Sequence, residues 1–266
     1  MQIATLNINS INARLPNLIG WLRENMPDVM LLQEIKTEFD NFPFFDLQML
    51  GYEAKILGQK GYNGVAILSR YPLKLTAQNL PNFFDKNARY IECETNIYGK
   101  NITFASVYLP NGNPPYNNPC NNEKFIYKLN WMNAFLKHAR NLIIQNKNVI
   151  FAGDFNVIME NNDVYNPELF VDNALFNPQV QAKLRFLTRI GYCDAYRQLH
   201  LNESGYTFWD YTGNALKNDL GMRIDYIFTS PYMTDCLSQC KVDKKFRFLE
   251  KSSDHTILIA DFKDKP

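Results

Sequence analysis

Short apolar runs alternate with amphipathic stretches along this 266-residue chain. Runs of about four to eight mostly apolar residues, bounded by polar or turn residues, predict buried β-strands. The chain carries such runs at residues 3–8, 29–32, 64–68, 102–109, 149–152, 224–228 and 256–260. Because the runs are spread over the whole length, every part of the chain is expected to contribute strands.

Helical periodicity marks two further segments. Apolar side chains recur at helical spacing from Leu15 to Met26 and again between Glu123 and Gln145. Many strands mixed with few helices predict an α/β sandwich of two packed sheets flanked by helices. The length suits one large domain, and without a composition shift or linker we expect a single domain over residues 1–266.

Two polar segments are expected to form long loops. Residues 110–122 are rich in Pro and Asn, and residues 159–179 are polar and turn-rich. Loops of this length in a compact domain are more often functional than idle. A third polar segment, residues 241–247, alternates Lys and Arg with apolar residues, and this alternation predicts a solvated strand face.

Composition and net charge exclude few classes of protein. The formal net charge is +1, so a nucleic-acid enzyme would have to gather its basic residues on one face. No apolar run approaches the roughly 20 residues that span a membrane, and the first residues do not resemble a secretory signal. We therefore expect a cytoplasmic protein, nucleoid-associated if bacterial. The five scattered cysteines favour buried thiols over disulfides or a zinc site.

Polar residues terminate or interrupt several of the apolar runs. The runs lead into Gln33 and Glu34, into Asp154 and Asn156, through Asp225, and out of Asp254 and His255. Charged groups that enter apolar runs are costly unless they are paired or bound to a metal. Taken singly, a Glu at a strand end is usually a solvated terminus and a lone His usually a structural one. Their joint occurrence at strand ends favours a metal-centred site.

The residue types suit hydrolysis of a phosphodiester. The anionic oxygens of the phosphate repel a nucleophile, and a hard divalent cation with oxygen ligands neutralises that charge. Carboxylates such as Glu34 and Asp154 suit Mg²⁺, which takes few protein ligands and keeps several waters. An Asp–His pair can orient or deprotonate the attacking water, and Tyr108 can hydrogen-bond the phosphate.

Several short sequence blocks match those of a known family. The chain resembles the exonuclease III family of AP endonucleases, within the endonuclease/exonuclease/phosphatase superfamily. The matching blocks, in family order, are TLNIN at 5–9, LLQEIK at 31–36, GQKGYNGVAILSR at 58–70, VYLPNG at 107–112, GDFN at 153–156, YTFWDY at 206–211, GMRIDYIF at 221–228 and SDH at 253–255. The resemblance implies a DNase I-like, four-layer α/β sandwich.

The resemblance also implies roles for individual residues. It places metal ligands at Asn7, Glu34, Asp154, Asn156, Asp254 and His255. It places catalytic side chains at Tyr108, Asp154, Asn156, Asp225 and His255. It places DNA contacts at Tyr62, Arg70, Asn111, Asn173, Phe208, Trp209 and Met222. Phe208, Trp209 and Met222 would form the wall of a pocket for an extruded, base-less sugar.

The implied function is DNA repair. A member of this family would hydrolyse the phosphodiester 5′ to abasic sites in double-stranded DNA, and it would also act as a 3′-5′ exonuclease and 3′-phosphatase. The implied cofactor is Mg²⁺, with Mn²⁺ as a substitute, and the implied state is a monomer that does not engage membranes. Met222 stands where some members carry Trp, which points to looser abasic discrimination.

Two other functions remain open at this point. One is a superfamily phosphatase acting on a small molecule or a lipid head group. The other is a nucleic-acid-binding regulator without nuclease activity, which gaps in the catalytic set would favour. Substrate choice in the presence of magnesium or EDTA separates these two functions from the nuclease.

Overall fold

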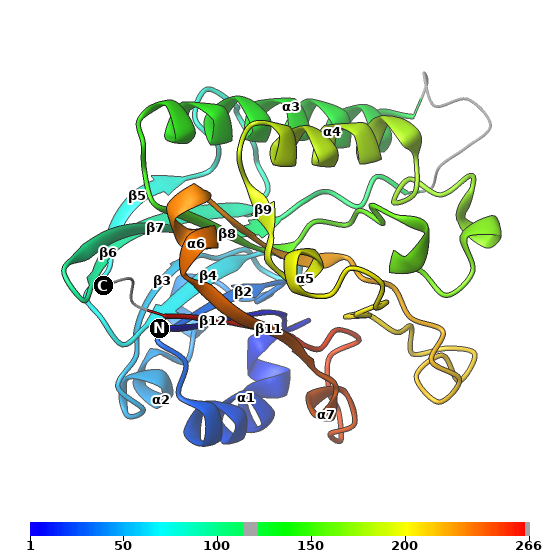
Figure 1. Cartoon of the computed structure of the whole chain (residues 1–266). Coiled ribbons are helices and arrows are strands. Elements are labelled where there is room, and N and C mark those ends of the chain that lie inside the picture. The colour runs from blue at the N-terminus through cyan, green and yellow to red at the C-terminus, as the bar shows by residue number, and fades with distance from the viewer. Residues whose placement is uncertain (114–121, 264–266) are drawn as a thin grey trace.

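Two six-stranded sheets pack face to face in the computed structural model, which describes residues 1–113 and 122–263. Helices cover the outer face of each sheet, so the layers run helix, sheet, sheet, helix (Figure 1). Each sheet is mixed, with one parallel pair of strands among antiparallel ones. The predicted α/β sandwich is confirmed, including its four layers and DNase I-like architecture.

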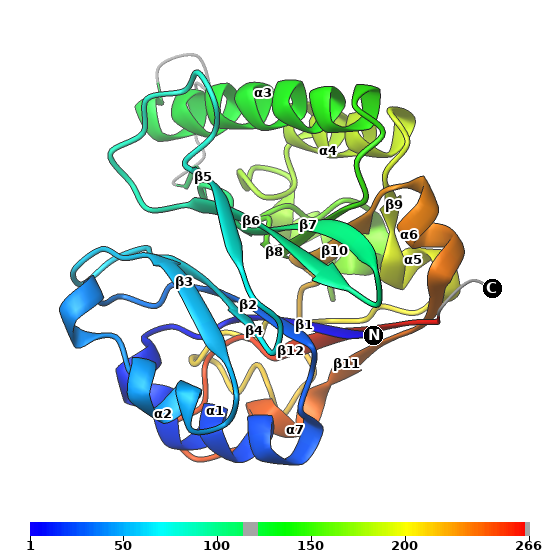
Figure 2. The same ribbon diagram turned by 90° about the vertical axis from the view of Figure 1, so that its left-hand side faces the viewer.

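The first sheet has the strand order β11-β12-β1-β2-β4-β3. Its strands are β1 (Gln2–Asn7), β2 (Val29–Gln33), β3 (Glu53–Leu57), β4 (Val65–Ser69), β11 (Leu237–Asp243) and β12 (Ile257–Phe262). Its outer face carries α1 (Ile11–Asn25), α2 (Phe44–Gln48) and α7 (Lys244–Arg247), seen in the lower part of Figure 2. The 3₁₀ turn η1 (Phe39–Asn41) precedes α2 in the chain.

The second sheet has the strand order β5-β6-β7-β8-β10-β9. Its strands are β5 (Lys74–Gln78), β6 (Tyr90–Ile97), β7 (Lys100–Tyr108), β8 (Val149–Asp154), β9 (Cys193–Asp194) and β10 (Asp225–Thr229). The long helices α3 (Glu123–Ile144) and α4 (Pro178–Arg189) lie side by side over its outer face (Figures 1 and 2). The shorter elements are α5 (Ala195–Leu199), α6 (Pro231–Cys236), η3 (Asn161–Asp163) and η4 (Pro167–Phe170).

The central strands are buried on both faces. In β2, Val29 and Leu31 pack between the two sheets, whereas Met30 and Leu32 pack under the outer helices. A strand covered on both faces carries apolar residues at every position, because successive side chains point to opposite sides. This double burial is why the central strands appear in the sequence as continuous apolar runs.

The two sheets approach closely at one edge, where Gly153 leaves room for the neighbouring backbone and for Gln33 of the other sheet. Gly153 has φ +147°, and a Cβ built there would lie 2.0 Å from the carbonyl oxygen of Val107 and 2.9 Å from Nε2 of Gln33. Only glycine fits both this backbone conformation and this spacing. Gln33 of the first sheet also donates a 2.9 Å hydrogen bond to Ser106 of the second. The strand ends that follow these residues are thereby brought together.

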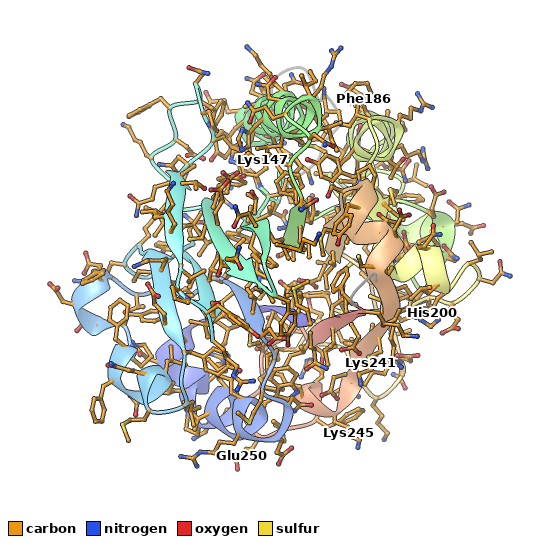
Figure 3. All side chains as sticks on the ribbon, turned by 60° about the vertical axis from the view of Figure 1, so that its left-hand side comes forward. Lys147, Phe186, His200, Lys241, Lys245 and Glu250 are labelled. Carbon is orange, nitrogen blue, oxygen red and sulfur yellow. The ribbon has the colours of Figure 1, made fainter. Side chains whose placement is uncertain are left out.

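The predicted strands all coincide with observed ones, but the sequence missed others. Strands β3, β5, β6, β9 and β11 and helix α4 lie where no run predicted them. The prediction of a strand face over residues 241–247 was wrong in part. Strand β11 ends at Asp243, and α7 then buries Phe246 and Arg247 while Lys245 stays at the surface (Figure 3). The reason is that Phe246 packs under the first sheet with α1 and α2.

Three other expectations meet the structure only in part. Residues 114–121 of the expected loop at 110–122, with Cys120, lie outside the described residues. The expected loop at 159–179 contains the short turns η3 and η4, and α4 begins at its end. The four described cysteines are free thiols. Among the described residues, no helix is long and apolar enough to cross a membrane.

Candidate active site

The pairing of the strands brings the predicted strand-end residues to one edge of the sandwich. Parallel pairing sets Asn7 at the end of β1 beside Gln33, and Glu34 follows directly. In the second sheet, parallel β7 and β8 set Tyr108 beside Asp154, and antiparallel β10 sets Asp225 opposite Asp154. Residues far apart in sequence therefore converge because their strands end at the same edge.

Asn7 joins the carboxylates of the two sheets. Its side-chain amide donates to Glu34 Oε1 at 2.7 Å and to Asp154 Oδ2 at 3.0 Å. Tyr108 donates its hydroxyl to the same Glu34 oxygen at 2.9 Å, and Lys36 pairs with the other oxygen at 2.8 Å. Burial would raise the pKa of Glu34, but the hydrogen bonds from Asn7 and Lys36 outweigh it and lower the pKa. Glu34 is therefore an ionised carboxylate at neutral pH.

An Asp–His pair faces Asp154 from the other side. His255 Nδ1 lies 2.8 Å from Asp225 Oδ2, and His255 Nε2 lies 3.8 Å from Asp154 Oδ2. Burial disfavours the charged imidazole, yet the charge and hydrogen bond of Asp225 raise the pKa of His255. Burial raises the pKa of Asp154 to about 7, against the opposing effect of the His255 charge. Asp154 is thus placed to accept a proton near neutral pH, and His255 to hold one.

Amide side chains extend the site along the neighbouring loops. Asn111 donates to Asn156 Oδ1 at 3.0 Å, and Asn113 donates to Asn173 Oδ1 at 3.3 Å. These residues border a cavity of about 560 Å³. The predicted site residues that line it are Glu34, Tyr108, Asn111, Asp154, Asn156, Asn173, Phe208, Met222, Asp254 and His255.

Phe208 and Met222 form an apolar wall of this cavity. They pair through two backbone hydrogen bonds of 3.0 and 2.9 Å, and the Phe208 ring packs edge-on to His255 at 5.0 Å. Trp209 does not join them, so its predicted place in the pocket wall was wrong. It is fully buried and donates its indole N–H to Asp219 at 3.0 Å, because alternate residues of an extended segment point to opposite sides.

The two remaining DNA contacts predicted from the sequence lie outside the cavity. Tyr62 is 74% exposed on the loop between β3 and β4, at the Glu34 end of the sheet. Arg70 follows the other end of β4, where its backbone N–H donates to Asp28 before β2 begins. Because β4 runs antiparallel to β2, Arg70 lies at the opposite edge from the active site. Its assignment as a DNA contact stays a prediction.

The oxygen ligands of the site suit Mg²⁺. Within the described parts of the chain, no three His, Cys, Asp or Glu residues form a ligand group for a metal ion. Magnesium takes only one or two protein carboxylates and keeps several waters. Ionised Glu34, with Asp154 beside it through Asn7, fits that requirement. As placed, the Asn7 oxygen instead accepts from the backbone N–H of Asn9.

Some residues of the site were missed by sequence reasoning. Asn9 links Asp254 and Lys36, with distances of 3.1 and 2.6 Å. Arg89 lies over the Tyr108 ring, 4.7 Å from its centroid. Glu34 and Lys36 both adopt a φ of +50°, a costly conformation for residues other than glycine and typical of functional sites. The blocks TLNIN and LQEIK contained Asn9 and Lys36, but no periodicity distinguished them from solvated residues.

Lys128 is the most important residue of the site that sequence reasoning missed. It lies on the apolar stripe of α3, is fully buried, and donates to the carbonyl oxygens of Asn111, Asn156 and Ala174 at 2.9, 2.7 and 3.3 Å. Its stem runs over Gly112, where a Cβ would lie 2.7 Å from its Cδ. Burial lowers the pKa of its ammonium to about 7. One side chain thus holds three loops that carry amides of the site.

Replacing Lys128 with Met is expected to lower kcat/KM by about 10- to 100-fold, because small displacements of positioning groups have effects of this size. The three carbonyl groups would lose their shared donor, and the loops that carry Asn111 and Asn156 would shift. Steady-state cleavage assays measure the effect. Lys124→Met, one turn earlier on the exposed side of α3, is the matched control and should cleave as wild type does. Equal rates for both variants would contradict this role.

The fold and the strand-edge chemistry together define a hydrolase of phosphate esters, and comparison with known proteins agrees. A model of the Endonuclease/Exonuclease/phosphatase family matches residues 4–255. The chain belongs to this family. Within it, the chain is a nuclease of the exonuclease III type of AP endonucleases.

Individual relatives cover nearly the whole chain. An exodeoxyribonuclease of Bacillus subtilis is 27% identical over 91% of this chain and 93% of its own length. The 3′ phosphatase NExo from Neisseria, solved with product DNA hairpin, is 34% identical, with a TM-score of 0.91 over 99% of each chain. An AP endonuclease from Archaeoglobus fulgidus is 33% identical, with a TM-score of 0.90 over 98% of this chain and 99% of its own.

Proposed function

We propose that this protein is a magnesium-dependent AP endonuclease that also processes 3′ ends. It hydrolyses the phosphodiester 5′ to an abasic site in double-stranded DNA and leaves a 3′-hydroxyl. The observation that carries the proposal is one cavity lined by ionised Glu34, by Asp154 and His255 and by an apolar wall, with Asp225 paired to His255 behind it. We further propose that the protein acts as a monomer.

The side chains divide the reaction among them. Asp154 aligns the attacking water and accepts its proton, since burial holds its pKa near neutrality. His255, charged through its pairing with Asp225, donates to an oxygen of the scissile phosphate. Tyr108, Asn111 and Asn156 line the same cavity and are hydrogen-bond donors held at fixed positions.

The metal belongs at Glu34. Glu34 would hold it, with Asp154 and Asp254 as neighbouring carboxylates and the amide oxygens of Asn7 and Asn156 as further candidates. Family nucleases of this kind depend on a metal, and the donor chemistry here suits Mg²⁺, with Mn²⁺ as a substitute. When bound, such a cation neutralises charge on the phosphate and on the leaving oxygen.

The apolar wall supports a preference for abasic sites. A nucleotide without its base costs little to extrude from the duplex, and it fits a pocket that an intact base would overfill. Phe208 and Met222 offer such a surface directly beside His255. Met222 is unbranched and adaptable, so it selects less strictly than a rigid indole would. This favours a broad enzyme that accepts both abasic sites and blocked 3′ ends.

The named relatives support both activities. The Archaeoglobus structure is of an AP endonuclease, and the Neisseria structure is of a 3′ phosphatase with product DNA. A phosphatase of small molecules or lipid head groups would share the metal chemistry but would not need the apolar wall. A regulator without nuclease activity would be expected to lack catalytic side chains. Here all four are present: Glu34 and Asp154 accept hydrogen bonds from Asn7, and Asp225 pairs with His255.

One assay tests the proposal. An end-labelled duplex with a single abasic site is compared with an intact duplex and with a soluble phosphomonoester, each with Mg²⁺ and with EDTA. Incision of the abasic strand in Mg²⁺ at a rate well above that of the other substrates supports the proposal. Turnover of the phosphomonoester alone indicates the small-molecule phosphatase. DNA binding without cleavage in Mg²⁺ or Mn²⁺ indicates the regulator.

Removal of the metal gives a second prediction. EDTA is expected to abolish incision, and Mg²⁺ to restore it. Glu34→Gln keeps the shape of the side chain but removes the charge that attracts the cation, so its half-saturating Mg²⁺ concentration should rise by tenfold or more. A magnesium titration of the cleavage rate measures this. Glu53→Gln, at the far edge strand β3, is the control and should titrate as wild type does. The assignment of Glu34 fails if both variants respond alike.

A further inference from the structure

Two loops border the active-site edge and carry exposed aromatic side chains. Residues 58–64 join β3 to β4, and Val65, the first residue of β4, pairs with Gln33 beside Glu34. Residues 79–89 join β5 to β6, and the last of them, Arg89, accepts a 2.8 Å backbone hydrogen bond from Tyr108. Both loops therefore project from the edge of the sandwich where the catalytic residues gather.

The two loops are joined to each other. The backbone N–H of Gly64 donates to the carbonyl of Ala88 at 2.9 Å, and Asn63 donates to the Asn87 side chain at 3.2 Å. Gln59 accepts from the backbone N–H of Ala88 at 2.9 Å. The loops thus form one continuous surface, which is held in place by hydrogen bonds between them.

The second loop is also fixed to the body of the protein. Leu80 is buried, and Phe83 packs against the helical core with its ring 6.4 Å from that of Tyr127. The hydroxyl of Tyr127 donates to Asp85 at 2.6 Å, so this acidic group is engaged within the loop. Phe84, between these anchors, is 87% exposed.

Phe84 and Tyr62 therefore present two aromatic side chains to solvent, 87% and 74% exposed, on adjoining loops at the rim of the active site. Lys60 and Lys86 are exposed on the same loops, and Arg89, at the end of the second loop, lies over the Tyr108 ring. We call Tyr62 and Phe84, with Lys60 and Lys86, the aromatic rim. Large exposed apolar side chains beside cations are the combination that binds single-stranded nucleic acid, through base stacking and phosphate pairing.

We propose that the aromatic rim is a stacking platform for unpaired bases next to the scissile phosphate, so that the enzyme binds DNA with a single-stranded flank more tightly than continuous duplex. In continuous duplex each base is covered on both faces by its neighbours, and an aromatic ring finds no free face. At a gap, a frayed end or an overhang the outermost base is open. This inference rests on the proposed function, because it takes the substrate to be DNA.

The test is a binding measurement that requires no turnover. Fluorescence anisotropy in EDTA compares a labelled partial duplex that has a single-stranded overhang with a blunt duplex of the same paired sequence. Phe84→Ala and Tyr62→Ala should each weaken binding to the overhang DNA by about five- to tenfold and leave the blunt duplex almost unchanged. Phe84→Tyr should bind as wild type does. Phe45→Ala, 72% exposed on α2, is the matched control and should change neither DNA.

Several outcomes would overturn the proposal. One is equal binding of both DNAs by wild type and Phe84→Ala, and another is an equal loss on both DNAs. A third is a change in self-association of Phe84→Ala with unaltered DNA binding, which would assign the rim to a contact between copies. Thermal melting confirms that the variants fold. If the wild type binds the overhang DNA through the rim but cleaves no abasic DNA, the proposed function fails while the platform stands.

Discussion

Replacing Asp154 with Asn is expected to slow incision of abasic DNA by about 10³-fold or more, the range reported for loss of a positioned general base. Asn is nearly isosteric and can still accept the 2.9 Å hydrogen bond from the backbone N–H of Asn156. It cannot take a proton from water, and it removes the negative charge that faces His255. Single-turnover cleavage of an end-labelled abasic duplex at saturating Mg²⁺ measures the effect.

The fold should survive this change. Burial raises the pKa of Asp154, so the folded protein binds its proton more tightly than the unfolded chain does. A raised carboxyl pKa means that the ionised group opposes folding above the unfolded pKa, near 4. Asp154→Asn should therefore melt at or above the wild-type temperature at pH 8. Asp46→Asn, exposed on α2, is the control with wild-type rates. Turnover within tenfold of wild type would remove Asp154 from the mechanism.

Replacing Arg223 with Met is expected to produce the largest loss of stability, about 3–5 kcal/mol in the free energy of unfolding. Arg223 is fully buried and binds Asp163 at 2.7 and 3.1 Å and Asp194 at 2.7 Å. Met fills similar space but leaves two buried carboxylates without their main partner. Arg197 still reaches Asp163 at 2.6 Å, so Asp194 suffers most. Urea unfolding followed by far-UV circular dichroism measures the change.

A surface ion pair provides the comparison for Arg223. Lys147 pairs with Glu94 at 2.8 Å, but its side chain is 43% exposed. Exposed pairs contribute about 1 kcal/mol or less, so Lys147→Met should change the free energy of unfolding by no more than that. A loss below 1 kcal/mol for Arg223→Met would show that the buried network contributes little.

The central strands were predictable because both of their faces are buried, which makes them continuous apolar runs. Strand β6 was missed because a buried charged residue interrupts its run. Glu92 interrupts the apolar pattern of that strand, yet it is buried in the sheet. It is bonded to His138, Tyr90 and Thr76 at 2.7, 2.6 and 2.8 Å. His138 lies 46 residues away on α3, so no local pattern could indicate the pairing. These hydrogen-bond partners offset the cost of burying the Glu92 carboxylate, and a local sequence pattern does not contain them.

The edge strands were missed because they have little to bury. β5 is mostly exposed, and β3 has a single buried residue, Ile56. Their residues follow no apolar alternation that would distinguish them from loops. Their place in the sheets depends on backbone pairing with β6 and β4, which the side-chain pattern does not record.

For the active site, strand-end positions were predictable and side-chain directions were not. Glu34, Asp154 and His255 were found because several polar residues together end buried strands, whereas Asn7 was found only through the family resemblance. The position of Arg70 at the edge opposite the active site was not predictable, because no local pattern records the direction of β4 relative to β2. Trp209 was predicted to line the pocket but is fully buried. Lys128 was not singled out in the sequence, yet it is fully buried and binds the backbone of three loops of the site.

The division of the active site between two sheets has a consequence for the newly made protein. Asn7 and Glu34 come from the first part of the chain, Asp154 and Asp225 from later strands, and His255 precedes the last strand. No early fragment holds the complete set, and no single sheet does. A ribosome-bound chain therefore cannot cut DNA until residue 255 has emerged and both sheets have docked. Because the site needs strands from both sheets, an incomplete chain lacks nuclease activity.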